Sequence, residues 1–279
     1  MGVRRWVGAL AAAASTAVMV AGPASAAAPA APGAVAAPAT VAAPDDRREI
    51  VGGRVAKPGA YPWMVHLSRG CGGALVAPRV VLTAAHCVRK SGYDSSITIT
   101  AGASDLHSAD AIRVKSRYVR RAPGFREAIK GDDWALIRLS EALDLPTLRV
   151  TTDATYDRGT FTTLGWGATR EGASSQQRHL REVAVPYVSD RVCGKAYRGA
   201  GYDFANKEML CAGDTRKGGV DACQGDSGGP LVRRDGAGGW VQVGVVSWGH
   251  GCARRNYPGV YTQLSTFAED IASEVADLA

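Results

Sequence analysis

Runs of basic residues are missing from this sequence. The 279-residue chain has a formal net charge of +7, yet no five consecutive residues are all Lys or Arg. Contiguous basic segments are typical of nucleic-acid-binding regions. We therefore expect no nucleic-acid partner.

Long apolar runs are also scarce. The longest, Trp6–Val20, has about 15 residues, fewer than the ~20 that span a bilayer. It follows Arg4 and Arg5 and precedes Ala24-Ser25-Ala26, a small-x-small cleavage site. This order predicts a secretory signal peptide over residues 1–26, with a membrane anchor as the alternative. We expect a secreted, extracellular protein without a membrane partner.

Metal-ligand spacings are absent. The six cysteines include no Cys-x-x-Cys, and no histidines are paired at zinc-site spacing. In an exported chain, six cysteines predict up to three disulfides, with 15 pairings. The loop 102–115 contains Asp105 and Asp110 but no glutamate, so we assign no calcium. We predict neither a metal nor a cofactor.

Residues 27–49 are rich in Ala and Pro and then charged, ending in Asp45-Asp46-Arg47-Arg48-Glu49. Such composition buries little apolar surface. It indicates a pro-segment, although composition alone leaves a plain linker open.

The rest of the chain favours an all-β fold. Short apolar or alternating runs recur between Gly, Pro, Asp and Ser, which predicts a barrel or a sandwich. The expected strands are Trp63–Leu67, Gly73–Val76, Val80–Thr83, Ile97–Ala101, Ala135–Leu139, Phe161–Gly165, Val183–Tyr187, Pro230–Val232, Trp240–Val246 and Gly259–Gln263.

The most specific motif is Asp221 to Pro230, Asp-Ala-Cys-Gln-Gly-Asp-Ser-Gly-Gly-Pro. An isolated Gly-x-Ser-Gly is often a surface turn, but the whole string resembles the nucleophile loop of chymotrypsin/trypsin family serine endopeptidases. Three further segments are similar to that family: Leu82–Cys87 (Leu-Thr-Ala-Ala-His-Cys), Asp133 before the apolar run 134–139, and Ile50–Gly53 (Ile-Val-Gly-Gly). The alanine-rich leader and few cysteines resemble bacterial members of the family, and among these the actinobacterial ones.

The resemblance covers residues 50–279 and implies two six-stranded antiparallel barrels with the active site between them. It implies a triad in which His86 is general base toward the nucleophile Ser227, and Asp133 orients the imidazole. Asp132, one position earlier in the chain, is the alternative to Asp133 for this role. The backbone N–H groups of Gly225 and Ser227 would form the oxyanion hole. The implied disulfides are Cys71–Cys87, Cys193–Cys211 and Cys223–Cys252.

The resemblance places Asp221 at the floor of the specificity pocket, where a carboxylate would select Arg or Lys before the scissile bond. Ala222 stands where trypsins often have serine, which predicts a stronger preference for Arg over Lys. The pocket walls would include Ser247, Trp248, Gly249 and Gly259.

Activation should require a new amino terminus. In the family, Asp226 is buried and pairs with the α-amino group of Ile50 after the pro-segment is removed. Glu49, however, stands where trypsinogens carry Lys or Arg. This departure predicts activation by another protease rather than by the enzyme itself.

A terminal helix is expected from Phe267, Ile271, Val275 and Leu278, which recur at helical spacing. Thr266–Glu269 fits a capping box. We expect this helix to pack on the second barrel through its apolar stripe.

The other histidines are weaker candidates for the general base. His66, His107 and His179 are expected to be solvent-facing or packed, and His250 to be a loop residue near the cleft.

The sequence therefore predicts a serine endopeptidase with acyl-enzyme chemistry. Its partners would be substrates with Arg or Lys at the cleavage site, an activating protease and protein inhibitors, and we expect a monomer. An inactive binding protein of the same family is the alternative. An α/β-hydrolase would need the order Ser, Asp, His and helices between strands, and neither is found.

Overall fold

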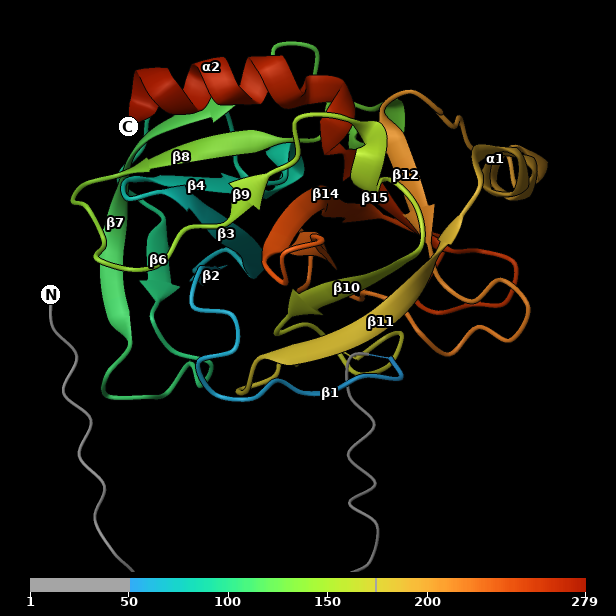
Figure 1. Ribbon diagram of the computed structural model, residues 1–279, viewed down its shortest axis with the longest axis horizontal. Helices are drawn as coiled ribbons and strands as arrows, with labels where there is room; N and C mark the ends of the chain where they lie inside the picture. The colour runs from blue at the N-terminus through green and yellow to red at the C-terminus, as the bar shows by residue number, and fades with distance from the viewer. Residues whose placement is uncertain (1–50, 174) are drawn as a thin grey trace, which may run out of the picture. The chain divides into compact units, whose positions relative to one another are not determined.

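The computed structural model describes residues 51–173 and 175–279 (Figure 1). The predicted signal peptide, the pro-segment and Ile50 lie outside these residues.

Six antiparallel strands close into a first barrel. Their order is β7-β6-β2-β3-β4-β8, and β8 pairs back with β7, while β5 extends β7 at one edge. Closure leaves no free edge within the ring. The strands are β2 (Met64–Leu67), β3 (Cys71–Ala77), β4 (Val80–Thr83), β5 (Gly92–Tyr93), β6 (Thr98–Ala101), β7 (Ile112–Arg121) and β8 (Ala135–Leu139).

The second barrel repeats this plan. Its order is β11-β10-β13-β14-β15-β12, and β12 pairs back with β11. Two short strands join it: β1 pairs antiparallel with β11, and β9 pairs parallel with β14. The strands are β1 (Arg54–Val55), β9 (Arg149–Val150), β10 (Thr160–Gly165), β11 (Arg181–Val188), β12 (Met209–Ala212), β13 (Pro230–Arg234), β14 (Trp240–Trp248) and β15 (Gly259–Gln263). The predicted pair of six-stranded barrels is confirmed.

The expected C-terminal helix is present as α2 (Ala268–Leu278), but two details of its prediction were wrong. It packs on the first barrel: the Phe267 ring lies 6.2 Å from that of Trp134, and Arg138 Nε donates to the Leu278 carbonyl at 2.8 Å. Figure 1 shows α2 running alongside β8. The capping box does not form, because Thr266 lies within a preceding 3₁₀ turn and its hydroxyl donates to the Lys207 carbonyl.

A second helix, α1 (Asp190–Gly199), was not predicted. It contains two glycines and precedes β12, to which the Cys193–Cys211 disulfide ties it. The 3₁₀ turns are η1 (Ala85–Cys87), η2 (Ala128–Lys130), η3 (Ala154–Tyr156) and η4 (Leu264–Phe267).

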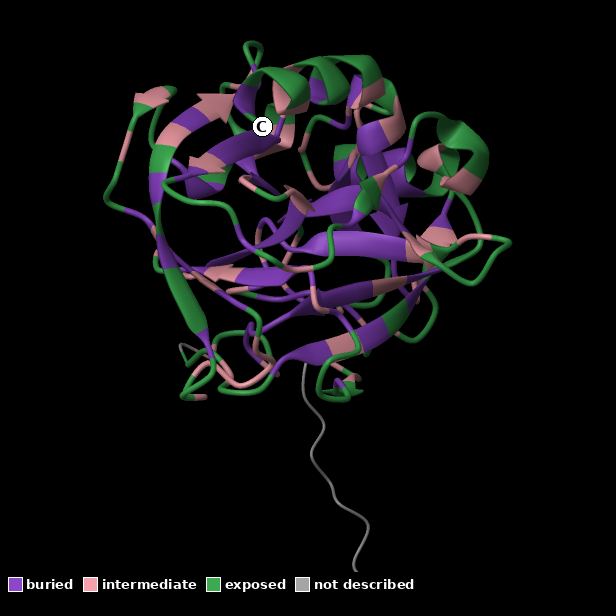
Figure 2. Cartoon of the chain, turned by 60° about the vertical axis from the view of Figure 1, so that its left-hand side comes forward, coloured by how far each residue is buried: buried purple, intermediate pink, exposed green. Residues whose placement is uncertain are grey.

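The buried residues lie mainly on the strands of the two barrels. In Figure 2 the strands are largely buried, whereas the connecting loops and the outer sides of both helices are exposed. The apolar stripe of α2 lies in the same core cluster as Trp134 and Leu136, so its assignment to the core is confirmed. No helix among the described residues has the length and apolarity needed to cross a membrane.

Candidate active site

The loop that carries Ser227 joins the two barrels. Gly72 N, on β3 of the first barrel, donates to the Ser227 carbonyl at 2.8 Å, while Gly228 N donates to the Val246 carbonyl on β14 at 2.9 Å. Gly228 has φ +77°, and a Cβ there would lie 2.2 Å from Thr83 Oγ1. Only glycine fits this approach. The loop of the predicted nucleophile therefore reaches the segment that precedes His86.

His86 lies on the 3₁₀ turn η1, which the Cys71–Cys87 disulfide fixes to β3. Its Nδ1 is 2.7 Å from Asp133 Oδ2, and its backbone N donates to Asp133 Oδ1 at 3.0 Å. These two contacts orient the ring with Nε2 free to face a substrate or Ser227. No hydrogen bond between Ser227 Oγ and His86 Nε2 is present in the described part of the chain; such bonds often tighten only when substrate is bound.

Asp133 is buried at the start of β8. Besides His86, its Oδ2 accepts a 2.5 Å hydrogen bond from Ser247 Oγ, and its carbonyl accepts one from Thr262 Oγ1 at 2.7 Å. Ser247 was predicted only as part of the pocket wall, so the hydrogen bond that joins this wall to the Asp133 carboxylate was missed. The alternative residue, Asp132, has φ +52°, and its carboxyl group lies against Gly124.

Beside Ser227 lies a cavity of about 120 Å³. At its buried end Asp221 Oδ1 accepts a hydrogen bond from Ala222 N, and Oδ2 accepts one from Ala253 N, both at 2.9 Å. Burial raises the pKa of Asp221 to about 7, although these two N–H groups act in the opposite direction. All six residues predicted for the specificity pocket line this cavity: Asp221, Ala222, Ser247, Trp248, Gly249 and Gly259.

Helix α1 supports one wall of this cavity. The Tyr197 ring packs against Trp248, with the ring centres 4.7 Å apart, and its hydroxyl donates to the Pro258 carbonyl at 2.5 Å. The sequence did not predict this support, because the helix itself was missed.

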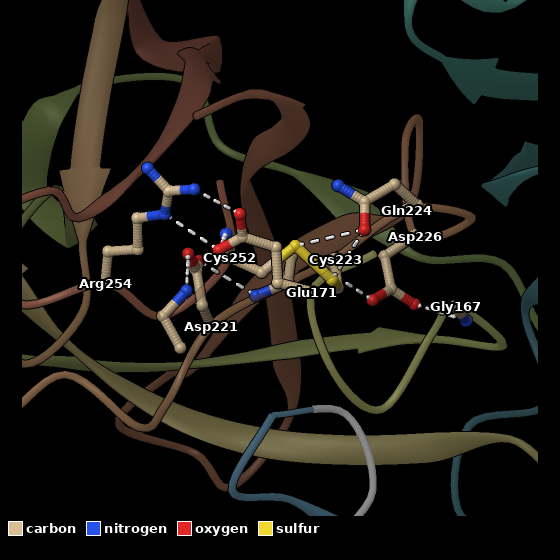
Figure 3. The surroundings of a disulfide bond; sticks show 10 residues. Gly167, Glu171, Asp221, Cys223, Gln224, Asp226, Cys252 and Arg254 are labelled. Atoms are coloured by element: carbon tan, nitrogen blue, oxygen red, sulfur yellow. Dashed lines mark hydrogen bonds and ion pairs between the residues drawn. A yellow bond between two sulfur atoms is a disulfide. The ribbon is translucent and has the colours of Figure 1, made fainter. Parts of the chain in front are cut away.

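Asp226 is completely buried on the other side of the Cys223–Cys252 disulfide from Asp221 (Figure 3). Its carboxylate accepts hydrogen bonds from Gly167 N at 2.8 Å and Cys223 N at 2.9 Å. Burial raises its pKa to about 6 despite these donors. Its predicted partner, the amine of Ile50, is outside the described residues. The next residue, Val51, contacts the same loop at Asp221, whose backbone N donates to the Val51 carbonyl at 3.2 Å.

A family model described as Trypsin matches residues 50–271. The chain belongs to the trypsin family. It is 53% identical over 229 residues to a trypsin-like protease of Streptomyces glaucescens, covering 82% of this chain and 83% of that protein. It is 38% identical over 224 residues to trypsin beta of Drosophila erecta, covering 77% and 84% respectively. The predicted family, its actinobacterial resemblance and the activity class are thereby confirmed: the protein is a serine endopeptidase.

This trypsin-family protein has three disulfides among its described residues. They join Cys71 to Cys87, Cys193 to Cys211 and Cys223 to Cys252. These are the pairs that the family resemblance implied.

The remaining histidines of this trypsin-family chain lie outside the triad geometry. His66 is half-buried against the edge of Trp166, and burial lowers its pKa; its Nε2 is 3.2 Å from Gln176 Oε1. His107 and His179 are exposed. His250 packs against Tyr257 rather than in the specificity pocket.

Potential metal ligands are few in this trypsin-family protein. Within residues 51–173 and 175–279, one group of three lies close together: Cys71, His86 and Cys87. The two sulfurs are joined in a disulfide and cannot bind a metal as thiolates. Asp105, in the loop considered for calcium, receives two hydrogen bonds from the Arg178 guanidinium, at 2.8 and 2.7 Å.

Proposed function

We propose that this serine endopeptidase is secreted and cleaves peptide bonds after Arg or Lys. The observation that carries the proposal is the buried carboxylate of Asp221, at the closed end of the cavity that Ser227 lines. A long cationic side chain in this cavity would pair with the carboxylate and leave its carbonyl carbon near Ser227 Oγ.

The proposed reaction begins when Ser227 Oγ attacks the carbonyl carbon and His86 Nε2 takes the hydroxyl proton. Asp133 holds the imidazole tautomer and stabilises the imidazolium. The N–H groups of Gly225 and Ser227 stabilise the oxyanion, each worth about 3 kcal/mol of barrier. His86 then gives its proton to the leaving amine, and an acyl-enzyme ester remains on Ser227. Water hydrolyses that ester by the same route and releases the acid.

Arg should be preferred to Lys. A guanidinium can meet the Asp221 carboxylate with two parallel hydrogen bonds, whereas an ammonium relies more on neighbouring acceptors. Ala222 supplies no hydroxyl beside that carboxylate.

The chain would be made as a zymogen with three parts: a signal peptide at 1–26, a pro-segment at 27–49 and the protease domain at 50–279. A buried carboxylate such as Asp226 needs a cationic partner to be favourable when ionised. The α-amino group of Ile50, freed by cleavage after Glu49, is the partner that we assign. An activating protease that accepts Glu, or one of broad specificity, would therefore act in trans, and protein inhibitors are expected partners of the mature enzyme.

Replacing the nucleophile tests the catalytic assignment. Ser227→Ala should lower kcat/KM on an Arg peptide by more than ~10³-fold, because removal of one triad member usually costs more than this. Secretion and thermal stability should be unchanged. A smaller loss would refute the triad. A wild-type protein that does not react with a serine-directed phosphonate would instead identify an inactive binding protein.

Replacing the pocket acid tests specificity separately. Asp221→Ser should remove the preference for cationic side chains in a positional-scanning peptide assay. A desolvated cation without its partner costs about 2–5 kcal/mol, which corresponds to a 30- to 5,000-fold loss of kcat/KM for Arg. Near-parental cleavage after Arg by this variant would show that another group selects the substrate.

A further inference from the structure

A second and larger hollow, of about 760 Å³, lies between α1 and the loops 214–219 and 253–256. It shares no lining residue with the specificity pocket. Its lining contains no acidic residue but five cationic ones: Arg191, Lys195, Arg216, Lys217 and Arg255. We call this hollow the basic groove.

No ion pair holds the cations of the basic groove in the part of the chain that the structure describes, whereas Arg254 next to it is held by Glu171 at 2.8 Å (Figure 3). Two acids adjoin the lining residues in sequence. Asp190, next to Arg191, lines a different hollow, and Asp214 accepts hydrogen bonds at 2.9 Å from the backbone N of Arg216 and of Lys217. These backbone hydrogen bonds, and to a smaller extent the charges of Lys217 and Arg216, lower the pKa of Asp214. Asp214 therefore orders the loop backbone, while the side chains of Arg216 and Lys217 form no ion pair with it and stay exposed.

The backbone around the basic groove is held in place. The two loops are linked by the hydrogen bond from Asn256 N to the Thr215 carbonyl at 2.9 Å, and Gly218 N donates to the Asp214 carbonyl at 2.7 Å. Helix α1 is tied to β12 by the Cys193–Cys211 disulfide. A ligand would thus meet a largely preformed arrangement of positive charge, which lowers the ordering cost of binding.

One apolar side chain is exposed within this charged surface. Val192 on α1 lines the groove and is 42% exposed, which makes it one of four large apolar side chains that the described residues expose. A polysaccharide sulfate or nucleic acid would use the cations and gain little from Val192. A peptide that carries acidic side chains beside an apolar one would use both.

We propose that the basic groove is an exosite for an acidic segment of a protein substrate, with an apolar side chain of that segment packed on Val192. Two contacts connect the elements that line the groove to the specificity pocket. Tyr197 on α1 contacts the pocket wall at Trp248, and Ala253, two residues before Arg255, hydrogen-bonds to Asp221. A substrate could therefore occupy the exosite and the specificity pocket together, which raises its effective concentration at Ser227. Only this kinetic consequence rests on the proposed cleavage after Arg.

Binding can be measured without catalysis. The probe is a fluorescein-labelled peptide of Asp and Glu with one Leu and one Phe and no Lys or Arg, titrated with the Ser227→Ala protein by anisotropy. The double change Lys195→Glu/Arg216→Glu should weaken binding at least about tenfold, and added salt should weaken wild-type binding. The matched control, Lys115→Glu/Arg117→Glu, makes the same change in net charge on β7 of the first barrel and should bind like the parent.

Catalysis provides the second measurement. An Arg peptide joined to the acidic probe by a flexible linker should have a lower KM than the same Arg peptide alone. The Lys195→Glu/Arg216→Glu enzyme should lose this difference and cleave the short peptide normally. If cleavage after Arg failed altogether, the anisotropy result would still decide the exosite.

Three outcomes would overturn the exosite proposal. The first is equal probe affinity in the two double variants. The second is tight binding of heparin with no binding of the peptide, which would identify a polysaccharide site. The third is unchanged affinity when Leu and Phe of the probe are replaced by Ser, since Val192 would then have no apolar contact.

Discussion

Gly259 is the position where one added methyl group should disable the specificity pocket. A Cβ on Gly259 would lie 2.3 Å from Asp221 Oδ1, whereas ordinary contact begins near 3.4 Å. In Gly259→Ala the carboxylate must therefore move by about 1 Å, the difference between these distances. Such a move takes it away from Ala222 N and Ala253 N, which now donate to it at 2.9 Å.

The size of the effect follows from the contact with the substrate cation. A hydrogen bond to a charged group contributes about 1.5–3 kcal/mol, so its loss should lower kcat/KM for an Arg substrate about 10- to 150-fold. A misplacement of ~1 Å at a positioning residue can cost about 10²-fold, which agrees with this range.

The assay compares Arg peptide hydrolysis with the rate of labelling by a serine-directed fluorophosphonate. Gly259→Ala should lower the first and leave the second unchanged, because His86, Asp133 and Ser227 do not contact the new methyl group. Gly199→Ala, at the end of α1, is the control, since a Cβ there meets nothing within 4 Å. The reasoning is refuted if Gly259→Ala keeps parental kcat/KM, or if labelling falls in parallel with hydrolysis.

Two further predictions concern ionisation and activation. Burial raises the pKa of Asp221 to about 7, so the carboxylate that pairs with a cation is increasingly protonated below that pH. Benzamidine should therefore bind about tenfold more weakly for each pH unit below 7, and Asp221→Asn should lose this pH dependence. An affinity unchanged between pH 5 and 8 would contradict the prediction. Purified zymogen should stay inactive until a glutamyl endopeptidase is added, and Glu49→Lys should activate itself; N-terminal sequencing that finds Glu49 first in the active enzyme would disprove this, since one extra residue moves the amine by about 3.5 Å.

Local patterns in the sequence predicted the parts of the fold that depend on local chemistry. Val80–Thr83 and Gly259–Gln263 are strands with the expected bounds, because β-branched or aromatic residues favour extended backbone there. The apolar stripe of α2 was also visible at helical spacing. By contrast, β7 was missed although Arg113–Arg117 alternates between exposed cations and buried residues, because the strand continues into Arg120 and Arg121 and contains no continuous apolar run.

Tertiary choices were harder to predict. The stripe of α2 is apolar whichever barrel it meets, so sequence could not decide that Phe267 would contact Trp134 in the first barrel. Helix α1 has two glycines, which lower helix propensity, and its formation depends on a disulfide and on packing by Tyr197.

The candidate site was predictable as a set of residues but not as a set of contacts. The family motifs located the residues that line the pocket beside Ser227. They did not show that Ser247 would donate to Asp133, because that bond joins residues 114 positions apart in the chain.

The two ends of the described chain are exchanged between the barrels. Strand β1 comes before the first barrel in sequence yet pairs with β11 of the second, while α2 follows the second barrel and covers β8 of the first. The first barrel therefore cannot be covered until α2 has been made, whereas the second barrel receives β1 from the part of the described chain that is made first. Separately produced halves should each lack a terminal segment that the other one carries, and should gain stability when mixed.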